Sequence, residues 1–230
     1  MFVAGLWALL AASSLLAGAY IAERFSIPQR YVGRTMGFGA GALVAALAYE
    51  LIPGPNVADV WIWLAFGAGA LLFYGLDGVL ERRSAGEAGS SVSIALGALL
   101  DGIPESLVLG ISVAVGGSVS IGFLVAVFVS NLPEALSATV GLRTVRSTRW
   151  VYLLWTGIAV ASAVAAALGY AVASHLSTLD GRYVQALAAG AVLTMLSDSM
   201  MPEALKEGGR PTGLLTALGF AVAALLTLLE

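Results

Sequence analysis

The sequence has no cysteine, a single histidine and few charged residues. Without cysteine it can form neither a disulfide framework nor a thiolate metal site. Only 11% of the residues are charged, whereas soluble domains average about 25%. The net charge of −3 indicates no particular charged partner, and we expect no nucleic-acid partner.

Apolar residues dominate instead, at 59% of the 230 residues, with a mean hydropathy of +0.93. A soluble core of this size cannot hide so much apolar surface, whereas a bundle of membrane helices faces the lipid bilayer. Eight apolar stretches approach the roughly 20 residues that a helix needs to cross a bilayer. They lie at residues 2–22, 36–52, 60–79, 94–115, 121–142, 150–174, 183–201 and 214–229. We therefore expect an all-α polytopic membrane protein with a single transmembrane domain over residues 1–230.

The eleven basic residues alternate between the loops. Ten lie after the first, third, fifth or seventh stretch, and only Arg182 lies between the sixth and the seventh. Short loops rich in lysine and arginine stay in the cytoplasm. The distribution predicts an integral plasma (inner) membrane protein whose N- and C-termini both lie outside.

Two near-repeats, DGIPESL at 101–107 and SNLPEAL at 130–136, place carboxylates inside apolar stretches. A carboxylate at the centre of a bilayer costs about 3 kcal/mol, so its presence indicates a function. Each near-repeat also contains a proline, Pro104 or Pro133, which kinks a helix and frees the carbonyl four residues earlier. A freed carbonyl at membrane depth needs a cation or water as its partner.

Helix geometry groups the polar side chains of these near-repeats. Asp101 lies one turn before Glu105, and both Ser130 and Asn131 lie about one turn before Glu134. No lysine or arginine lies within the eight stretches to neutralise the glutamates. Carboxylate, amide and hydroxyl oxygens are ligands for a divalent cation, so we predict a metal site at these five residues. Protonated carboxyls, or a proton relay without metal, are the alternatives.

A second repeat relates the second and seventh stretches, because AGALVAALAYELIP at 40–53 aligns without a gap on AGAVLTMLSDSMMP at 189–202. The two segments are offset by 149 positions, and we expect them to cross the membrane in opposite directions. Inverted repeats of this kind are typical of transporters, with the substrate site at their interface. The alternative is that small-residue helix faces converge on similar strings.

Other polar residues allow weaker predictions. Glu50 and Asp198 lie near the ends of the second and seventh stretches, so they either line the two mouths of a transport pathway or are solvated helix ends. Asp77 is interpreted as an interfacial charge. We expect Glu203 in an inner loop, and the only histidine, His175, in an outer loop.

At these residues the chain resembles the ZIP family of divalent metal transporters. That family has eight spans, an outside N-terminus and a binuclear metal centre, with paired Pro-Glu motifs in spans four and five. The corresponding positions here are 101–105 and 130–134, and the segments ELIP and MMPEAL are also similar to their family counterparts. The resemblance implies a ZIP-like bundle with an inverted repeat, spans 1–3 and 6–8, around a central pair of proline-kinked helices, spans 4 and 5.

The sequence also departs from that family. Asp101 stands where the family usually has histidine, and Gly102 where it often has asparagine. The sixth stretch lacks the carboxylate that many members use for a second metal, so a second site is not expected. An all-oxygen site favours Mn(II) or Fe(II), whereas the resemblance implies zinc, which carboxylates also bind.

The sequence therefore predicts a transporter that moves a divalent metal ion, namely zinc, iron(II) or manganese(II), toward the cytoplasm. The metal is the cargo, and no resident cofactor is expected. We do not expect an enzyme, because the sole histidine lies outside the spans and no Ser–His pair can form there. An intramembrane metal-dependent enzyme and a structural membrane subunit are the alternatives, and a homodimer is left open.

Asp101→His tests the role of Asp101 as a replacement for the histidine of the family. An imidazole favours zinc more than a carboxylate does, so the variant should prefer zinc over manganese more strongly than the wild type. Competition of labelled zinc uptake by manganese measures this preference. An unchanged competition ratio would mean that Asp101 does not bind the metal.

Overall fold

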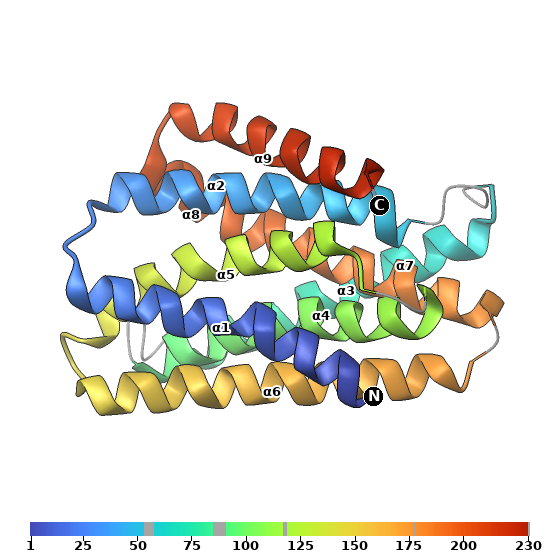
Figure 1. Ribbon diagram of the computed structural model, residues 1–230, viewed down its shortest axis with the longest axis horizontal. Helices are drawn as coiled ribbons and strands as arrows, with labels where there is room; N and C mark the ends of the chain where they lie inside the picture. The colour runs from blue at the N-terminus through green and yellow to red at the C-terminus, as the bar shows by residue number, and fades with distance from the viewer. Residues whose placement is uncertain (53–57, 85–90, 117–118, 177, 230) are drawn as a thin grey trace.

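The computed structural model describes residues 1–52, 58–84, 91–116, 119–176 and 178–229. Over these residues the chain forms nine α-helices, two short π-helical segments and no strand (Figure 1). The helices are α1 (Phe2–Arg24), α2 (Gln29–Ala46), α3 (Val60–Ser84), α4 (Ser91–Gly116), α5 (Ile121–Leu142), α6 (Thr148–Ser174), α7 (Thr178–Met195), α8 (Met201–Gly208) and α9 (Pro211–Leu228). The π-helical segments are η1 (Leu47–Leu51), which continues α2, and η3 (Leu196–Met200), which joins α7 to α8.

All eight predicted membrane spans are confirmed as helices long and apolar enough to cross a bilayer. The chain is therefore an all-α integral membrane protein. The seventh span differs most from its prediction. The sequence predicts an end at residue 201, whereas the helix continues through η3 and α8 to Gly208. Pro202 does not stop it because this proline lies in the first turn of α8, where proline is tolerated.

Successive spans run in opposite directions, so the two termini lie at the same end of the molecule (Figure 1). The most interior span is α2, with 67% of its apolar stretch buried, against 17% for α3 and 22% for α9. α2 packs on α9, α5 and α8, while α7 packs on α3 and α4. Leu71 of α3 and Leu214 of α9 are exposed, which gives these outer helices an apolar face toward lipid.

The helix contacts follow a two-fold pattern. The main pairs of contacting helices map onto one another under one exchange of helices. In this exchange α1 replaces α6, α2 replaces α7, α3 replaces α9 and α4 replaces α5, and the reverse. The pair α2–α9 maps onto α7–α3, α1–α5 onto α6–α4, and α2–α5 onto α7–α4. Exchanged helices run in opposite directions along the bundle (Figure 1).

Close backbone contact at glycines joins α2 to α9. A Cβ added to Gly41 would collide with the carbonyl oxygen of Thr216, and a Cβ added to Gly219 would collide with that of Phe38. Each helix therefore contributes one glycine to the crossing. The two backbones approach more closely than any other residue would allow.

The crossing of α7 and α3 has the same arrangement. Gly190 faces the carbonyl oxygen of Phe66, and Gly69 faces that of Leu187. Gly190 and Leu187 hold the positions, 149 residues later, of the two α2 residues in the first crossing. The sequence repeat and the close helix contacts therefore coincide.

The two π-helical segments also lie at equivalent positions of the repeat. Each continues an interior helix, α2 or α7, and each covers five residues at the same offset. π-Helical turns make up well under about 1% of residues and occur mostly as single turns, frequently at functional sites. Glu50 lies in η1, and Asp198 and Ser199 lie in η3.

Enlarging the glycines at the two crossings should destabilise the bundle. A valine at either crossing must push the paired backbones apart, and overpacking typically costs about 1–3 kcal/mol. Gly41→Val and Gly190→Val should each lower the midpoint of thermal unfolding of the detergent-solubilised protein. Gly75→Val in α3 is the control, because an added Cβ there meets open space. Equal midpoints for all three variants would contradict the close approach.

Candidate metal centre

A small cavity lies between α2, α4, α5 and the continuous helix formed by α7, η3 and α8. Its volume is about 30 Å³, where about 10–15 Å³ is enough for one water. The lining residues are Met36, Asp101, Glu105, Glu134, Met195, Ser199, Met200 and Glu203. Three of the five predicted metal ligands, drawn from both near-repeats, thus meet at one cavity.

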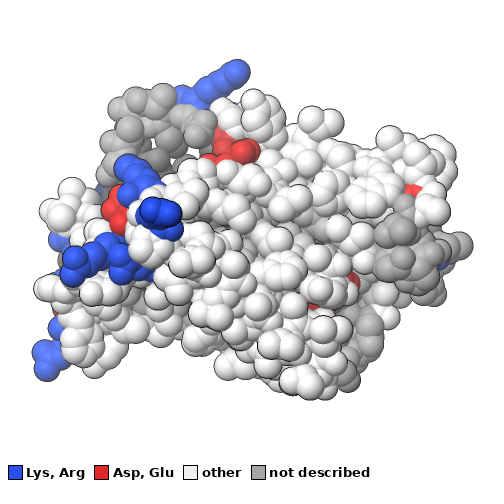
Figure 2. All heavy atoms as spheres, turned by 90° about the horizontal axis from the view of Figure 1, so that it is seen from above, with Lys and Arg blue, Asp and Glu red and all other residues white. Residues whose placement is uncertain are grey.

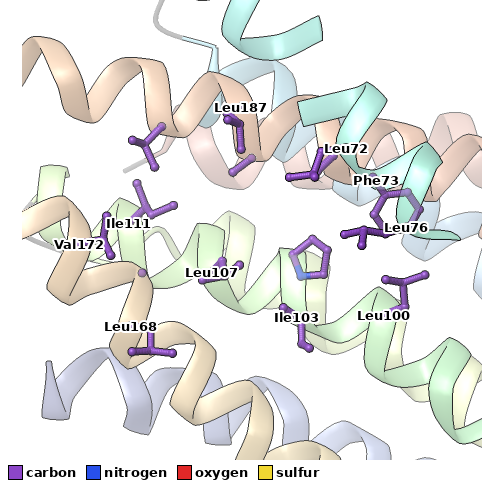
Figure 3. Close-up of a pocket in the computed structure, with 15 residues that line it drawn as sticks. Leu72, Phe73, Leu76, Leu100, Ile103, Leu107, Ile111, Leu168, Val172 and Leu187 are labelled. Carbon is purple, nitrogen blue, oxygen red and sulfur yellow. The ribbon is translucent and has the colours of Figure 1, made fainter. Parts of the chain in front are cut away.

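Two faces of α4 have different chemistry. Asp101 and Glu105 lie one turn apart and line the polar cavity. Ile103, Pro104 and Leu107 lie on another face, where they line an apolar cavity of about 350 Å³ between α3, α4, α6 and α7 (Figure 3). A single helix therefore divides a carboxylate cavity from an apolar one.

Glu105 is the most deeply buried carboxylate of the polar cavity, with 2% of its surface exposed. Its Oε2 atom has no hydrogen-bond partner among the described residues. None of the residues found around the cavity is lysine, arginine or histidine. A buried acceptor left unsatisfied costs about 1–3 kcal/mol, and more when it is charged. A cost of this size indicates that Glu105 is retained for function rather than stability.

Among the described residues, Asp101 has a weak neutral partner in Ser199. Ser199 Oγ lies 3.4 Å from Asp101 Oδ1 and also donates to the carbonyl oxygen of Met195 at 2.9 Å. A hydroxyl has one proton to donate. Because Ser199 makes its shorter hydrogen bond to Met195, its interaction with Asp101 is weak. Asp101 is also within electrostatic range of Asp77 and Glu203. These neighbouring carboxylates repel its charge.

Glu134 and Glu203 bring two more carboxylates to the cavity. Glu134 lies within electrostatic range of Asp101, Glu105 and Glu203. Ser137 Oγ donates to Glu203 Oε1 at 2.9 Å, which ties α5 to α8. Glu203 is exposed whereas Glu105 is buried. The four carboxylates therefore extend from the interior of the bundle to its surface.

The expected position of Glu203 in an inner loop is wrong. The residue lies on α8, in the continuation of the seventh span. The tetrapeptide Pro-Glu-Ala-Leu that carries Glu134 recurs at 202–205, with Glu203 in the same place. This repetition is the sequence feature that indicates a shared role for the two glutamates.

Two of the predicted ligands, Ser130 and Asn131, are not among the residues that line the cavity. Ser130 Oγ donates to the carbonyl oxygen of Val127 at 2.9 Å, and its backbone packs closely against Gly39 of α2. Asn131 is buried, with 6% of its surface exposed. Both residues lie within about one turn of Glu134, but only a narrow face of α5 reaches a cavity of this size.

The predicted pathway residues also lie away from the cavity. Glu50 Oε1 accepts hydrogen bonds from Ser120 Oγ at 2.5 Å and Thr227 Oγ1 at 3.0 Å. It therefore joins η1 to the start of α5 and the end of α9. Asp198 is exposed and does not line the cavity, although the next residue of η3, Ser199, does. His175 caps the C-terminal end of α6 and is exposed.

The carboxylates share a cavity without forming a closed coordination shell. Within the described part of the chain, no three carboxylate or imidazole side chains converge closely enough to hold a metal ion. The polar cavity nevertheless offers oxygen donors from α4, α5 and α8 around a space of atomic size.

No protein-family model matches the sequence, and no curated protein matches it. The function of the cavity is therefore inferred from its own side chains.

Among the described residues Glu105 Oε2 has no hydrogen-bond partner, which predicts a gain in stability when the carboxylate is removed. Glu105→Leu removes a buried acceptor and keeps a side chain of similar size, so we expect the free energy of unfolding to rise by about 1–3 kcal/mol. Glu50→Leu is the matched control, because it removes the acceptor of two hydrogen bonds and should destabilise the protein. Thermal unfolding in detergent measures both. A similar loss of stability in the two variants would contradict the assignment of Glu105 as unpartnered.

Proposed function

We propose that the protein is a membrane transporter for divalent metal cations, with Asp101, Glu105 and Glu134 at its binding site. The observation that carries the proposal is the burial of Glu105 among other carboxylates. No basic side chain is found among the described residues that line their cavity. Like charges in a poorly solvated space repel strongly. A divalent cation relieves this repulsion, and zinc, iron(II) and manganese(II) all accept carboxylate oxygen.

The gradient of exposure along the carboxylates supports a route for the cation. Glu105 is buried at one end and Glu203 is exposed at the other. Arg34 Nε donates to the carbonyl oxygen of Gly208 at 3.3 Å, which places the end of α8 beside a basic side chain. In this proposal the cation leaves the buried carboxylates by way of Glu203.

The distribution of basic side chains supports an orientation. Lysine and arginine gather at one end of an otherwise mostly uncharged surface (Figure 2), and this end is opposite the two termini (Figure 1). Loops rich in lysine and arginine stay in the cytoplasm. We place the basic end on the cytoplasmic side of a plasma (inner) membrane. A cation released past Glu203 therefore enters the cytoplasm.

The two-fold pattern of helix contacts supports an inverted repeat of spans 1–3 and 6–8 around α4 and α5. The paired glycine crossings and the matching π-helical segments lie at positions related by the sequence repeat. Transporters built this way bind their substrate at the interface of the repeats and expose it to each side in turn. Together with the paired Pro-Glu motifs, these features support a relation to the ZIP family.

Removing the charge of either buried glutamate should stop transport. Glu105→Gln and Glu134→Gln keep the size of the side chain. Each should lower the initial rate of metal uptake into proteoliposomes more than about tenfold, since even outer partners of a metal account for about 10–100-fold in affinity. Asp198→Asn is the matched control, because Asp198 is an exposed carboxylate of η3 that does not line the cavity.

Uptake is measured separately for zinc, iron(II) and manganese(II), with protein-free vesicles as the baseline. Baseline uptake of all three ions by the wild type would exclude the proposed transport. Full uptake by both glutamine variants would keep transport but remove this cavity as its site.

A further inference from the structure

Sulfur is the second kind of donor at the polar cavity. Met36 of α2, Met195 of α7 and Met200 of η3 line it together with the carboxylates. All three are buried, with 2%, 2% and 8% of their surfaces exposed. The chain has five methionines, so three of the four that follow Met1 gather at this one cavity.

Methionine often fills gaps in apolar cores, but this cavity is not apolar. Its other lining residues are four acidic side chains and a serine. Leucine would pack against the helices equally well. A thioether, in contrast, combines an apolar body with a sulfur lone pair that soft metal ions accept.

Glu105 gives independent evidence that the cavity holds a ligand. The residue is 2% exposed, and its Oε2 atom has no hydrogen-bond partner within the described residues. It lines the same cavity as the three methionines. A cation bound by this buried oxygen would therefore lie in a cavity that the three methionines also line.

The cavity is too small for a fully hydrated ion. Its volume is about 30 Å³, and one water needs about 10–15 Å³ of such space. A cation must shed most of its hydration shell to fit, which Mg²⁺ does reluctantly. The replacement ligands come from the protein, so their softness decides which ion binds best.

We propose that Met36, Met195 and Met200 set the metal preference of the site by adding thioether ligands to the carboxylates. The proposal rests on the proposed transport function and deepens it by naming the preferred class of ion. That class is the softer divalent d-block cations, such as Zn(II), over the harder Mn(II) and Mg(II). Oxygen ligands alone would favour the softer ions less strongly.

A triple variant tests the role of sulfur. The combined substitutions Met36→Leu, Met195→Leu and Met200→Leu keep the apolar volume nearly constant. Competition of labelled zinc uptake by manganese in proteoliposomes reports the preference. We expect the preference for zinc to fall about tenfold, the size typical of losing a supporting group of a metal site. Met201→Leu is the matched control, because Met201 is the next residue but does not line the cavity.

Metal binding by the purified protein gives a readout that does not depend on transport. X-ray absorption at the zinc edge should detect sulfur among the nearest neighbours of the metal in the wild type. The same measurement on Met201→Leu should be unchanged. The triple variant should retain oxygen neighbours and lose the sulfur.

The outcomes separate this inference from the proposed function. An unchanged competition ratio, or a changed ratio without sulfur at the metal, overturns thioether ligation and leaves the carboxylate site in place. An equal loss of uptake for every ion assigns the methionines to packing and also overturns it. Absence of both uptake and metal binding in the wild type removes the transport function, and the inference with it.

Discussion

Close backbone packing is the constraint on which this bundle depends. Lipid tails are as apolar as leucine, so burial of apolar side chains gives helices no drive to associate within a bilayer. The bundle instead uses glycines where α2 crosses α9 and where α7 crosses α3, and neither crossing has room for a side chain. Both crossings position an interior helix. They thereby also position η1 and η3, which continue those helices.

The packed frame brings carboxylates of different helices together inside the bundle. Asp101 and Glu105 of α4 and Glu134 of α5 lie around one cavity, enclosed by α2 and by the continuous helix of α7, η3 and α8. The unfavourable burial of Glu105 lowers the stability of the whole bundle. Sites that reduce stability in this way are expected where function requires them.

The spans and three cavity carboxylates were predictable because they depend on local pattern. Length and apolarity define the spans, and a four-residue spacing puts Asp101 and Glu105 on one helix face. The remaining features depend on how helices pack. Ser130 is away from the cavity because α5 turns it against α2, and Glu203 reaches the cavity because the seventh span continues past its proline. The place of the methionines at the cavity could not be predicted, since apolar residues within an apolar stretch form no distinguishing pattern.

The two repeats share backbone features but differ in chemistry. Glu50 in η1 and Ser199 in η3 hold equivalent positions. Glu50 joins the ends of α5 and α9, whereas Ser199 lies beside Asp101 at the cavity. Met200 of the cavity has Leu51 as its equivalent in η1. The glycine crossings and π-helical turns therefore belong to a common scaffold, whereas the side chains at equivalent positions of η1 and η3 make different contacts in the two repeats. Under the proposed transport function, a cycle that exchanges the conformations of two such unequal repeats would pass between states of unequal energy, and a bound cation would shift that balance only by the difference in its affinity for them.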